Sequence, residues 1–171
     1  HYVDALLGDV EHDTDYSVTN HFLYWTKEGA KPSDWKQPTQ RMHMTHKEWL
    51  VRANVTDAKP GPDMPHWYFR VSCCREGKRC APIASDFVFD ELPFYQPKDA
   101  SLYVKEPSWQ RGVYCRFGMK GVIGQNHFDA ERNFVTVLGG ERRYILAHPN
   151  QCGKLALYPA GHPSARQSTV D

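Results

Sequence analysis

Apolar and polar positions alternate most clearly in the second half of the chain, where they predict β-strands. Residues 113–117 alternate between apolar and more polar side chains, a period of two that is typical of a half-buried strand. Residues 134–138 and 142–146 are rich in β-branched, aromatic and long aliphatic side chains, and they flank Gly139-Gly140. Two such runs around a pair of glycines predict a β-hairpin. We therefore expect this half of the chain to be mainly β.

The first half of the chain predicts fewer elements. Residues 21–25 and 67–71 are short aromatic-rich runs, which are typical of strands. Thr45 is followed three residues later by Glu48, and this spacing is that of a capping box at the start of a helix. The sequence therefore predicts a short helix over residues 46–53.

Length and charge limit the classes of protein to consider. A chain of 171 residues has the size of one domain, so we expect a single domain over 1–171. We expect a mixed part at 1–110 and the core strands at 111–171. The 21 Lys and Arg balance 20 Asp and Glu, which predicts no nucleic-acid partner. No apolar run approaches the roughly 18 residues of a membrane span, so no span is expected.

The triplet His127-Phe128-Asp129 is the first candidate for chemistry. In an extended segment, residues two apart lie on the same face, so the imidazole and the carboxylate are expected side by side. Two of the three facial ligands of a non-haem iron can come from one strand in this way. The chain has nine histidines, so such a triplet also arises by chance. The alternative that both residues lie at the surface stays open.

The predicted hairpin adds two residues to this candidate. With the turn at 139–140, Arg142 falls on the same face as Asn133. If the alternation continues back along the chain, His127 and Asp129 share that face. An arginine buried there needs an anionic partner, and its planar fork suits a carboxylate. The pattern favours a metal ion beside a small dicarboxylate, and the open alternative leaves Arg142 in solvent.

Residues 127–171 carry a series of short motifs: His127-Phe-Asp129, Asn133-Phe134, Gly140-Glu-Arg142-Arg143, His148-Pro149, Leu157-Tyr158-Pro159, His162-Pro163 and Arg166-Gln167-Ser168. Their order resembles that of the Jumonji C (cupin-like) iron(II)/2-oxoglutarate-dependent oxygenases, and it is most similar to that of the asparaginyl hydroxylases. Weaker similarity extends upstream to Tyr68-Phe69 and to Phe117-Gly118. The resemblance therefore covers most of the chain.

The resemblance implies a mainly β fold, a double-stranded β-helix (cupin-type jelly roll) with helical decoration from the N-terminal half and incomplete at its C-terminal end. It implies that His127 and Asp129 are the first two ligands of Fe(II), with a third ligand, a histidine, expected beyond Asp171. It also implies three residues for the co-substrate 2-oxoglutarate: Arg142, Tyr68 and Asn133.

The function implied is hydroxylation that depends on iron(II) and 2-oxoglutarate, with a protein side chain as the expected substrate. The alternative is a catalytically degenerate cupin-like domain that serves as a structural or binding subunit of a larger assembly. Gly124 favours this alternative, because the family commonly has a threonine there that contacts the co-substrate. The expected partner is a protein or peptide substrate in the first case and the assembly in the second.

The five cysteines do not have the spacing of a zinc-binding motif. Free thiols are typical of the cytoplasm and nucleus, which we favour over the secretory pathway or an organelle. Disulfide formation in an oxidising compartment remains the alternative.

Overall fold

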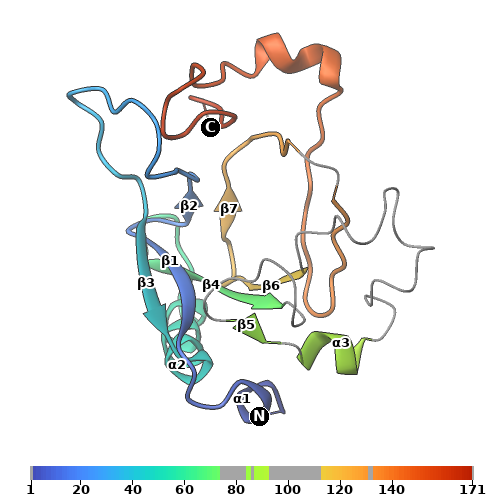
Figure 1. Cartoon of the computed structure of the whole chain (residues 1–171). Coiled ribbons are helices and arrows are strands. Elements are labelled where there is room, and N and C mark those ends of the chain that lie inside the picture. Colours follow the sequence, from blue (N-terminus) through green and yellow to red (C-terminus); the bar gives the residue numbers. More distant parts are fainter. Residues whose placement is uncertain (1, 74–83, 86, 93–112, 131–132, 171) are drawn as a thin grey trace. The chain divides into compact units, whose positions relative to one another are not determined.

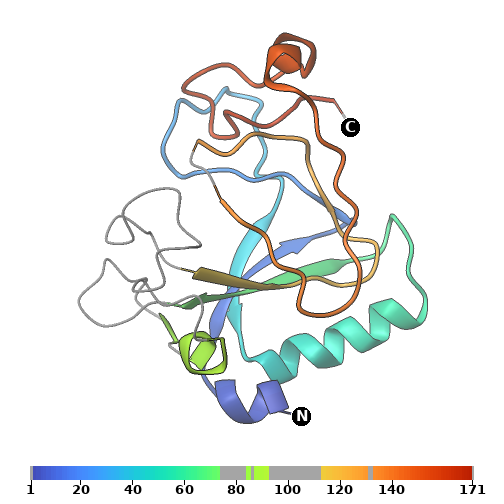
Figure 2. The same cartoon turned by 90° about the vertical axis from the view of Figure 1, so that its right-hand side faces the viewer.

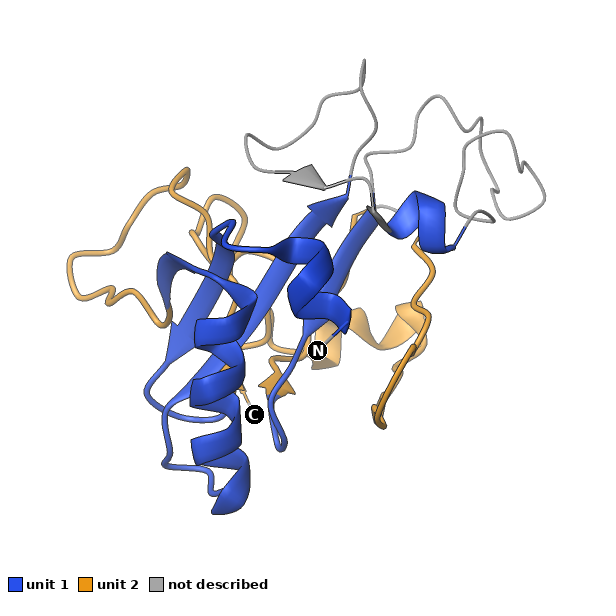
Figure 3. Ribbon diagram, turned by 90° about the horizontal axis from the view of Figure 1, so that it is seen from below, with its two compact units in different colours: residues 1–20, 40–122 blue, residues 21–39, 123–171 orange. Residues whose placement is uncertain are grey.

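The computed structural model describes residues 2–73, 84–85, 87–92, 113–130 and 133–170. Two compact units are distinguished in it (Figure 3): residues 1–20 with 40–122 form unit 1, and residues 21–39 with 123–171 form unit 2. Within each unit, the residues contact one another closely enough to form a compact body. The single domain expected over residues 1–171 stays a prediction.

Unit 1 is built on a five-stranded sheet (Figure 1). Four strands are antiparallel neighbours in the order β3 (Gln40–Met44), β1 (His12–Ser17), β4 (His66–Cys73) and β6 (Val113–Phe117), and β5 (Ala84–Ser85) pairs parallel with the end of β4. The register places Thr14 opposite Phe69 and Val71 opposite Cys115. The strands predicted over 67–71 and 113–117 are thus confirmed.

Helix α2 (His46–Ala58) is the longest helix among the described residues (Figure 2). It begins with the predicted capping box. The hydroxyl of Thr45 accepts a hydrogen bond from the backbone N–H of Glu48 at 3.2 Å, and the carboxylate of Glu48 accepts one from the backbone N–H of Thr45 at 2.8 Å. The helix continues past residue 53 because no glycine or proline interrupts it before Pro60. The helix predicted over 46–53 is confirmed, and it is longer than expected.

Removal of this cap is expected to lower the free energy of unfolding by about 1 kcal/mol. Thr45→Ala deletes the hydroxyl that satisfies the Glu48 N–H, whereas Thr45→Ser keeps it. Urea unfolding of the two variants measures the difference as a shift of the midpoint at constant slope. Equal midpoints for the alanine and serine variants would show that the cap contributes nothing.

The core of unit 1 lies between the sheet and α2. Phe69 at the centre of β4 is fully buried, and its ring lies 6.0 Å from that of Trp49 on α2 and 5.6 Å from that of Phe117 on β6. Two short helices, α1 (Tyr2–Leu7) and α3 (Phe87–Glu91), add buried apolar side chains to the same cluster. Burial of these rings holds the sheet and the helix together.

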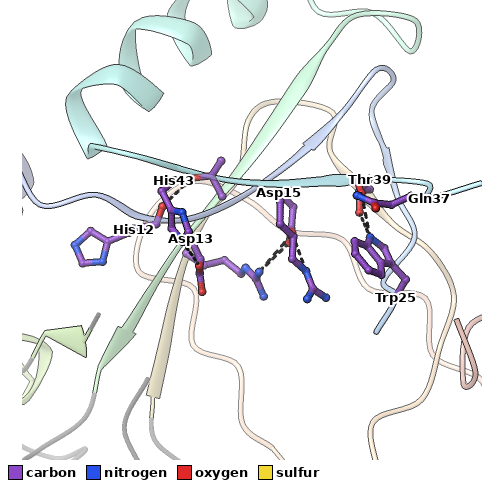
Figure 4. A network of polar contacts seen from close by, with 10 residues as sticks. His12, Asp13, Asp15, Trp25, Gln37, Thr39 and His43 are labelled. Carbon is purple, nitrogen blue, oxygen red and sulfur yellow. Dashed lines mark hydrogen bonds and ion pairs between the residues drawn. The ribbon is translucent and has the colours of Figure 1, made fainter. Parts of the chain in front are cut away.

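A network of charged side chains lies on β1, β3 and β4 (Figure 4). A carboxylate oxygen of Asp15 lies 3.3 Å from the guanidinium of Arg70, and the other oxygen lies 4.0 Å from that of Arg41. Asp13 on the same strand contacts His43 at 3.1 Å. Burial raises the pKa of Asp15 above its ordinary value, and the nearby Arg70 opposes that rise.

This raised pKa has a consequence for the dependence of stability on pH. The folded chain keeps a proton on Asp15 at pH values where the unfolded chain has lost it. The resulting stabilisation is full below the unfolded pKa of about 4 and is lost as the pH rises through the folded pKa. Compared with Asp15→Asn, which does not titrate, the wild type should therefore lose relative stability as the pH rises.

Denaturant unfolding of both proteins between about pH 3 and about pH 7 measures this change. Asp13→Asn is the control, because it removes a more exposed carboxylate of the same strand. A wild type that gains stability over Asp15→Asn as the pH rises would contradict the expected sign.

Unit 2 has little regular secondary structure. Its elements are β2 (His21–Phe22), which pairs parallel with β7 (Ile123–Gly124), and the 3₁₀-helix η4 (Pro149–Lys154). Two isolated antiparallel bridges align the extended segments around residues 127, 157 and 167. The strand predicted over 21–25 is thus present only at its first two residues.

Backbone hydrogen bonds attach the segment 21–39 to the later part of unit 2. The N–H of Thr26 donates to the carbonyl of Pro163 at 2.9 Å, and that of Ala30 donates to the carbonyl of Gly161 at 2.8 Å. Gly29 lies between these bonds with φ +118°, and a Cβ there would lie 2.7 Å from the Gly161 carbonyl oxygen. This approach requires glycine.

The hairpin predicted around Gly139-Gly140 is wrong. Residues 133–138 and 141–148 contain no strand, and their apolar side chains are exposed, with Phe134 69% and Leu146 86% accessible. Two strands by themselves are at best marginally stable in water and need a buried face. Turn residues and β-rich flanks were therefore not enough to form a ladder here.

Across the described residues, the chain combines an open five-stranded sheet and a two-stranded sheet with few helices, and it is mixed in class. A mainly β class is compatible with this arrangement. Among the same residues, no helix has both the length and the apolar character to cross a membrane.

Candidate metal centre

His127 and Asp129 lie in an extended segment of unit 2 that is bridged to a second segment. Two backbone hydrogen bonds, of 3.2 and 2.7 Å, join residues 126–128 to residues 166–168. They make His127 and Gln167 an antiparallel bridge. Extended backbone places residues two apart on the same side, so the two side chains are presented together, as the spacing predicts.

The imidazole of His127 is oriented by the backbone. Its Nδ1 lies 2.6 Å from the carbonyl oxygen of Gln125, and because a carbonyl only accepts, Nδ1 carries the proton. In the neutral ring, Nε2 therefore keeps a free lone pair. Nε2 lies 3.9 Å from Oδ1 of Asp129. A carbonyl partner of this kind is the usual support of a histidine that binds a metal.

The distance between these two donor atoms can be compared with a metal site. Ligands about 2.1 Å from one ion and at right angles to each other lie about 3 Å apart. The observed 3.9 Å between Nε2 of His127 and Oδ1 of Asp129 is about 1 Å longer. A metal bound by both atoms would therefore require a change in the side-chain angles of His127 or Asp129, which are 42% and 54% exposed.

Asp129 has two further contacts. The amide Nδ2 of Asn133 donates to Oδ2 at 2.8 Å, which leaves Oδ1 on the side of His127. The guanidinium of Arg166 lies 3.9 Å from Oδ1. Arg166 has φ +75°, a left-handed conformation that residues other than glycine rarely adopt and that often marks a functional site. Ion pairs this exposed contribute about 0–1 kcal/mol to stability.

The structure brings three of the five predicted residues together. His127, Asp129 and Asn133 form one cluster. Arg142 lies in the exposed segment 141–148, where the ladder that was to direct it toward this cluster is absent. Tyr68 is buried on β4 of unit 1. The roles of all five residues stay predictions.

Sequence reasoning did not select Arg166 as a site residue. The sequence feature that could have pointed to Arg166 is its place in the Arg166-Gln167-Ser168 motif. The structure pairs this motif with the extended segment that contains His127. Within the described residues, no group of three His, Cys, Asp or Glu side chains is arranged to hold a metal. His127 and Asp129 are two side chains that could contribute to such a site, and the third histidine expected beyond Asp171 stays a prediction.

No protein-family model matches the sequence. Membership of the Jumonji C family, the iron and 2-oxoglutarate therefore stay predictions. They depend on the geometry around His127 and on the motifs of residues 127–171.

Proposed function

We propose that this chain is an iron(II)- and 2-oxoglutarate-dependent hydroxylase of the Jumonji C type, with a double-stranded β-helix fold and a protein side chain as substrate. One observation carries the proposal. The lone pair of His127 Nε2 and the carboxylate oxygen Oδ1 of Asp129 lie 3.9 Å apart, with the imidazole held by the Gln125 carbonyl. A neutral imidazole and a carboxylate are two of the three ligands of a facial iron site.

Each residue of the cluster has a role in this proposal. His127 and Asp129 hold the metal, which with 2-oxoglutarate and O₂ supplies the oxidising chemistry. The Gln125 carbonyl keeps the proton on Nδ1 of His127, so that Nε2 stays available as a donor. Asn133 holds Oδ2 of Asp129 and thereby turns Oδ1 toward His127. Arg142 and Tyr68 are assigned to the distal carboxylate of 2-oxoglutarate from the family resemblance.

Conversion of 2-oxoglutarate to succinate tests the proposal. A chain that also carries the third histidine expected beyond Asp171, supplied with iron(II) and O₂, is expected to form succinate above the level seen with a chelator present. Asp129→Asn keeps the size of the side chain and removes its charge, so it should abolish this excess. Succinate formation that is unchanged by Asp129→Asn would reject the proposed metal ligands.

The assignment of Arg142 predicts a difference between two neighbouring arginines. Arg142→Ala is expected to weaken 2-oxoglutarate binding about ten- to a hundredfold, because charge-assisted hydrogen bonds to the carboxylate contribute roughly 1.5–3 kcal/mol. Arg143→Ala is the matched control and should leave the affinity unchanged. Titration calorimetry of both variants with manganese(II) present measures the two affinities. Equal losses would show that the effect is general to positive charge in this segment.

A second function is favoured by a different observation. The apolar side chains of residues 134–138 and 144–146 are exposed, and contiguous apolar surface often marks an interaction site. This surface fits a catalytically degenerate cupin-like domain that acts as a structural or binding subunit of a larger assembly. A chain that binds no manganese(II) but sediments as a stable complex with a partner would favour this function over the hydroxylase.

A further inference from the structure

Two arginines lie directly opposite each other on adjacent strands of unit 1. The register of the antiparallel pair β4 and β6 places Arg70 opposite Arg116. Side chains alternate between the two faces of a strand, and the ring of Phe69, next to Arg70, packs against that of Trp49 on α2. The two arginines therefore share the face turned away from α2. Residues in such a pair have Cβ atoms about 4.5–5.5 Å apart, and like charges there destabilise a sheet.

A carboxylate on the same face uses only part of the first arginine. Asp15 on β1 is in register with Tyr68, which lies two residues from Arg70 and so on the same face. Both oxygens of Asp15 contact a single nitrogen of Arg70, Nη2, at 3.4 and 3.3 Å (Figure 4). The Nε of Arg70 is buried and has no hydrogen-bond partner among the described residues. A buried donor without an acceptor is unfavourable, so Asp15 alone does not satisfy this guanidinium.

The second arginine is bound by nothing on this face. The Arg116 side chain is exposed, and it makes no hydrogen bond or ion pair within the part of the chain that the structure describes. Burial raises the pKa of the Asp15 carboxyl, and three arginines oppose that rise: Arg70, Arg41 and Arg116. Strands β1, β3, β4 and β6 thus present these three arginines with two aspartates, Asp13 and Asp15, and positive charge exceeds negative charge.

We propose that Arg70 and Arg116 form a binding site for a small oxyanion, which is a carboxylate or a phosphate group. A guanidinium can donate to two oxygens of such a group at once, so one oxyanion between the two side chains accepts hydrogen bonds from both. Its negative charge replaces the repulsion across the ladder with two attractive contacts. The site belongs to the sheet of unit 1 and does not depend on the proposed iron pair of unit 2.

Charge reversal at the exposed position tests the proposal, because Arg116→Glu supplies a negative charge from the chain itself. Without added oxyanion, Arg116→Glu should have a higher midpoint of urea unfolding than the wild type, since the opposed pair becomes attractive. Sodium phosphate should raise the midpoint of the wild type by mass action and leave that of Arg116→Glu unchanged. Sodium chloride at the same ionic strength is the control for screening. A lower midpoint for Arg116→Glu, or an equal response of both proteins to phosphate, would overturn the proposal.

Calorimetric titration identifies the oxyanion. The metal-free full chain is titrated with sodium phosphate and, separately, with sodium succinate at constant ionic strength. Arg116→Gln should weaken the binding at least tenfold. Arg52→Gln is the matched control and should leave the affinity unchanged, because Arg52 is on α2 and its guanidinium lies 5.2 Å from the centre of the Trp67 ring.

The two titrations distinguish the sources of the oxyanion. Binding of phosphate alone identifies a phosphate group, and binding of succinate alone identifies a carboxylate. If neither anion binds, or if Arg116→Gln keeps the affinity of the wild type, the two arginines do not form an oxyanion site.

Discussion

Replacing His127 with alanine is expected to weaken manganese(II) binding, measured with 2-oxoglutarate present, about a hundredfold or more. The imidazole is one of the two protein ligands proposed here, and its Nε2 faces Oδ1 of Asp129. Loss of a residue that only orients a ligand typically costs about 10–100-fold in metal affinity, so loss of a ligand should cost at least the upper end of that range. Manganese(II) replaces iron(II) because it does not oxidise during the titration, and electron paramagnetic resonance measures the free ion.

Two further variants show whether the loss is specific. Asn133→Ala removes only the hydrogen bond to Oδ2 of Asp129, so about a tenfold loss is expected. His148→Ala is the matched histidine control, because His148 caps η4 through the N–H of Asn150 and lies outside the cluster. An affinity that falls as much in His148→Ala as in His127→Ala would mean that the ligands are misassigned.

Phe69→Ala is expected to give the largest loss of folding stability, about 3–5 kcal/mol. Phe69 is 0% exposed, and its ring contacts those of Trp49 and Phe117 from two different elements. Alanine leaves a cavity that packed neighbours on both sides can only partly fill. Guanidinium unfolding followed by circular dichroism measures the change, which is a large part of the roughly 5–15 kcal/mol typical of a whole domain.

Phe134→Ala makes the same deletion at an exposed position. The Phe134 side chain is 69% exposed, so its removal should change the free energy of unfolding by no more than about 0.5 kcal/mol. A loss comparable with that of Phe69→Ala would mean that Phe134 is buried in solution, as the predicted hairpin would require.

The sequence predicted those helices and strands that are specified by a pattern of only a few neighbouring residues. The capping box at Thr45 and the alternation over 113–117 are of this kind, and both elements formed. Strand β1 was not predicted, because its inward positions are the polar His12 and Thr14, which hide the alternation. The order of the strands depends on contacts between distant residues, and no local pattern specifies it.

The candidate site divides in the same way. His127 and Asp129 are brought together by the period of an extended chain, which acts over two residues. The placement of Arg142 relied on a ladder across the Gly139-Gly140 turn, and such a ladder needs a covering layer that turn chemistry does not supply. The contact of Arg166 with Asp129 depends on the pairing of His127 with Gln167, forty residues later in the chain, and the sequence offered only a motif for it.

The bridge between His127 and Gln167 also determines how the cluster would respond to an occupant. A segment joined by two backbone hydrogen bonds opens locally at a small free energy compared with a sheet interior. An ion that binds only the closed arrangement stabilises it by mass action, so part of the binding free energy is used in ordering the segment. Amide hydrogen exchange at Phe128 and Ser168, which donate these two bonds, would slow as the ion is added, and their protection would report occupancy without any measurement of catalysis.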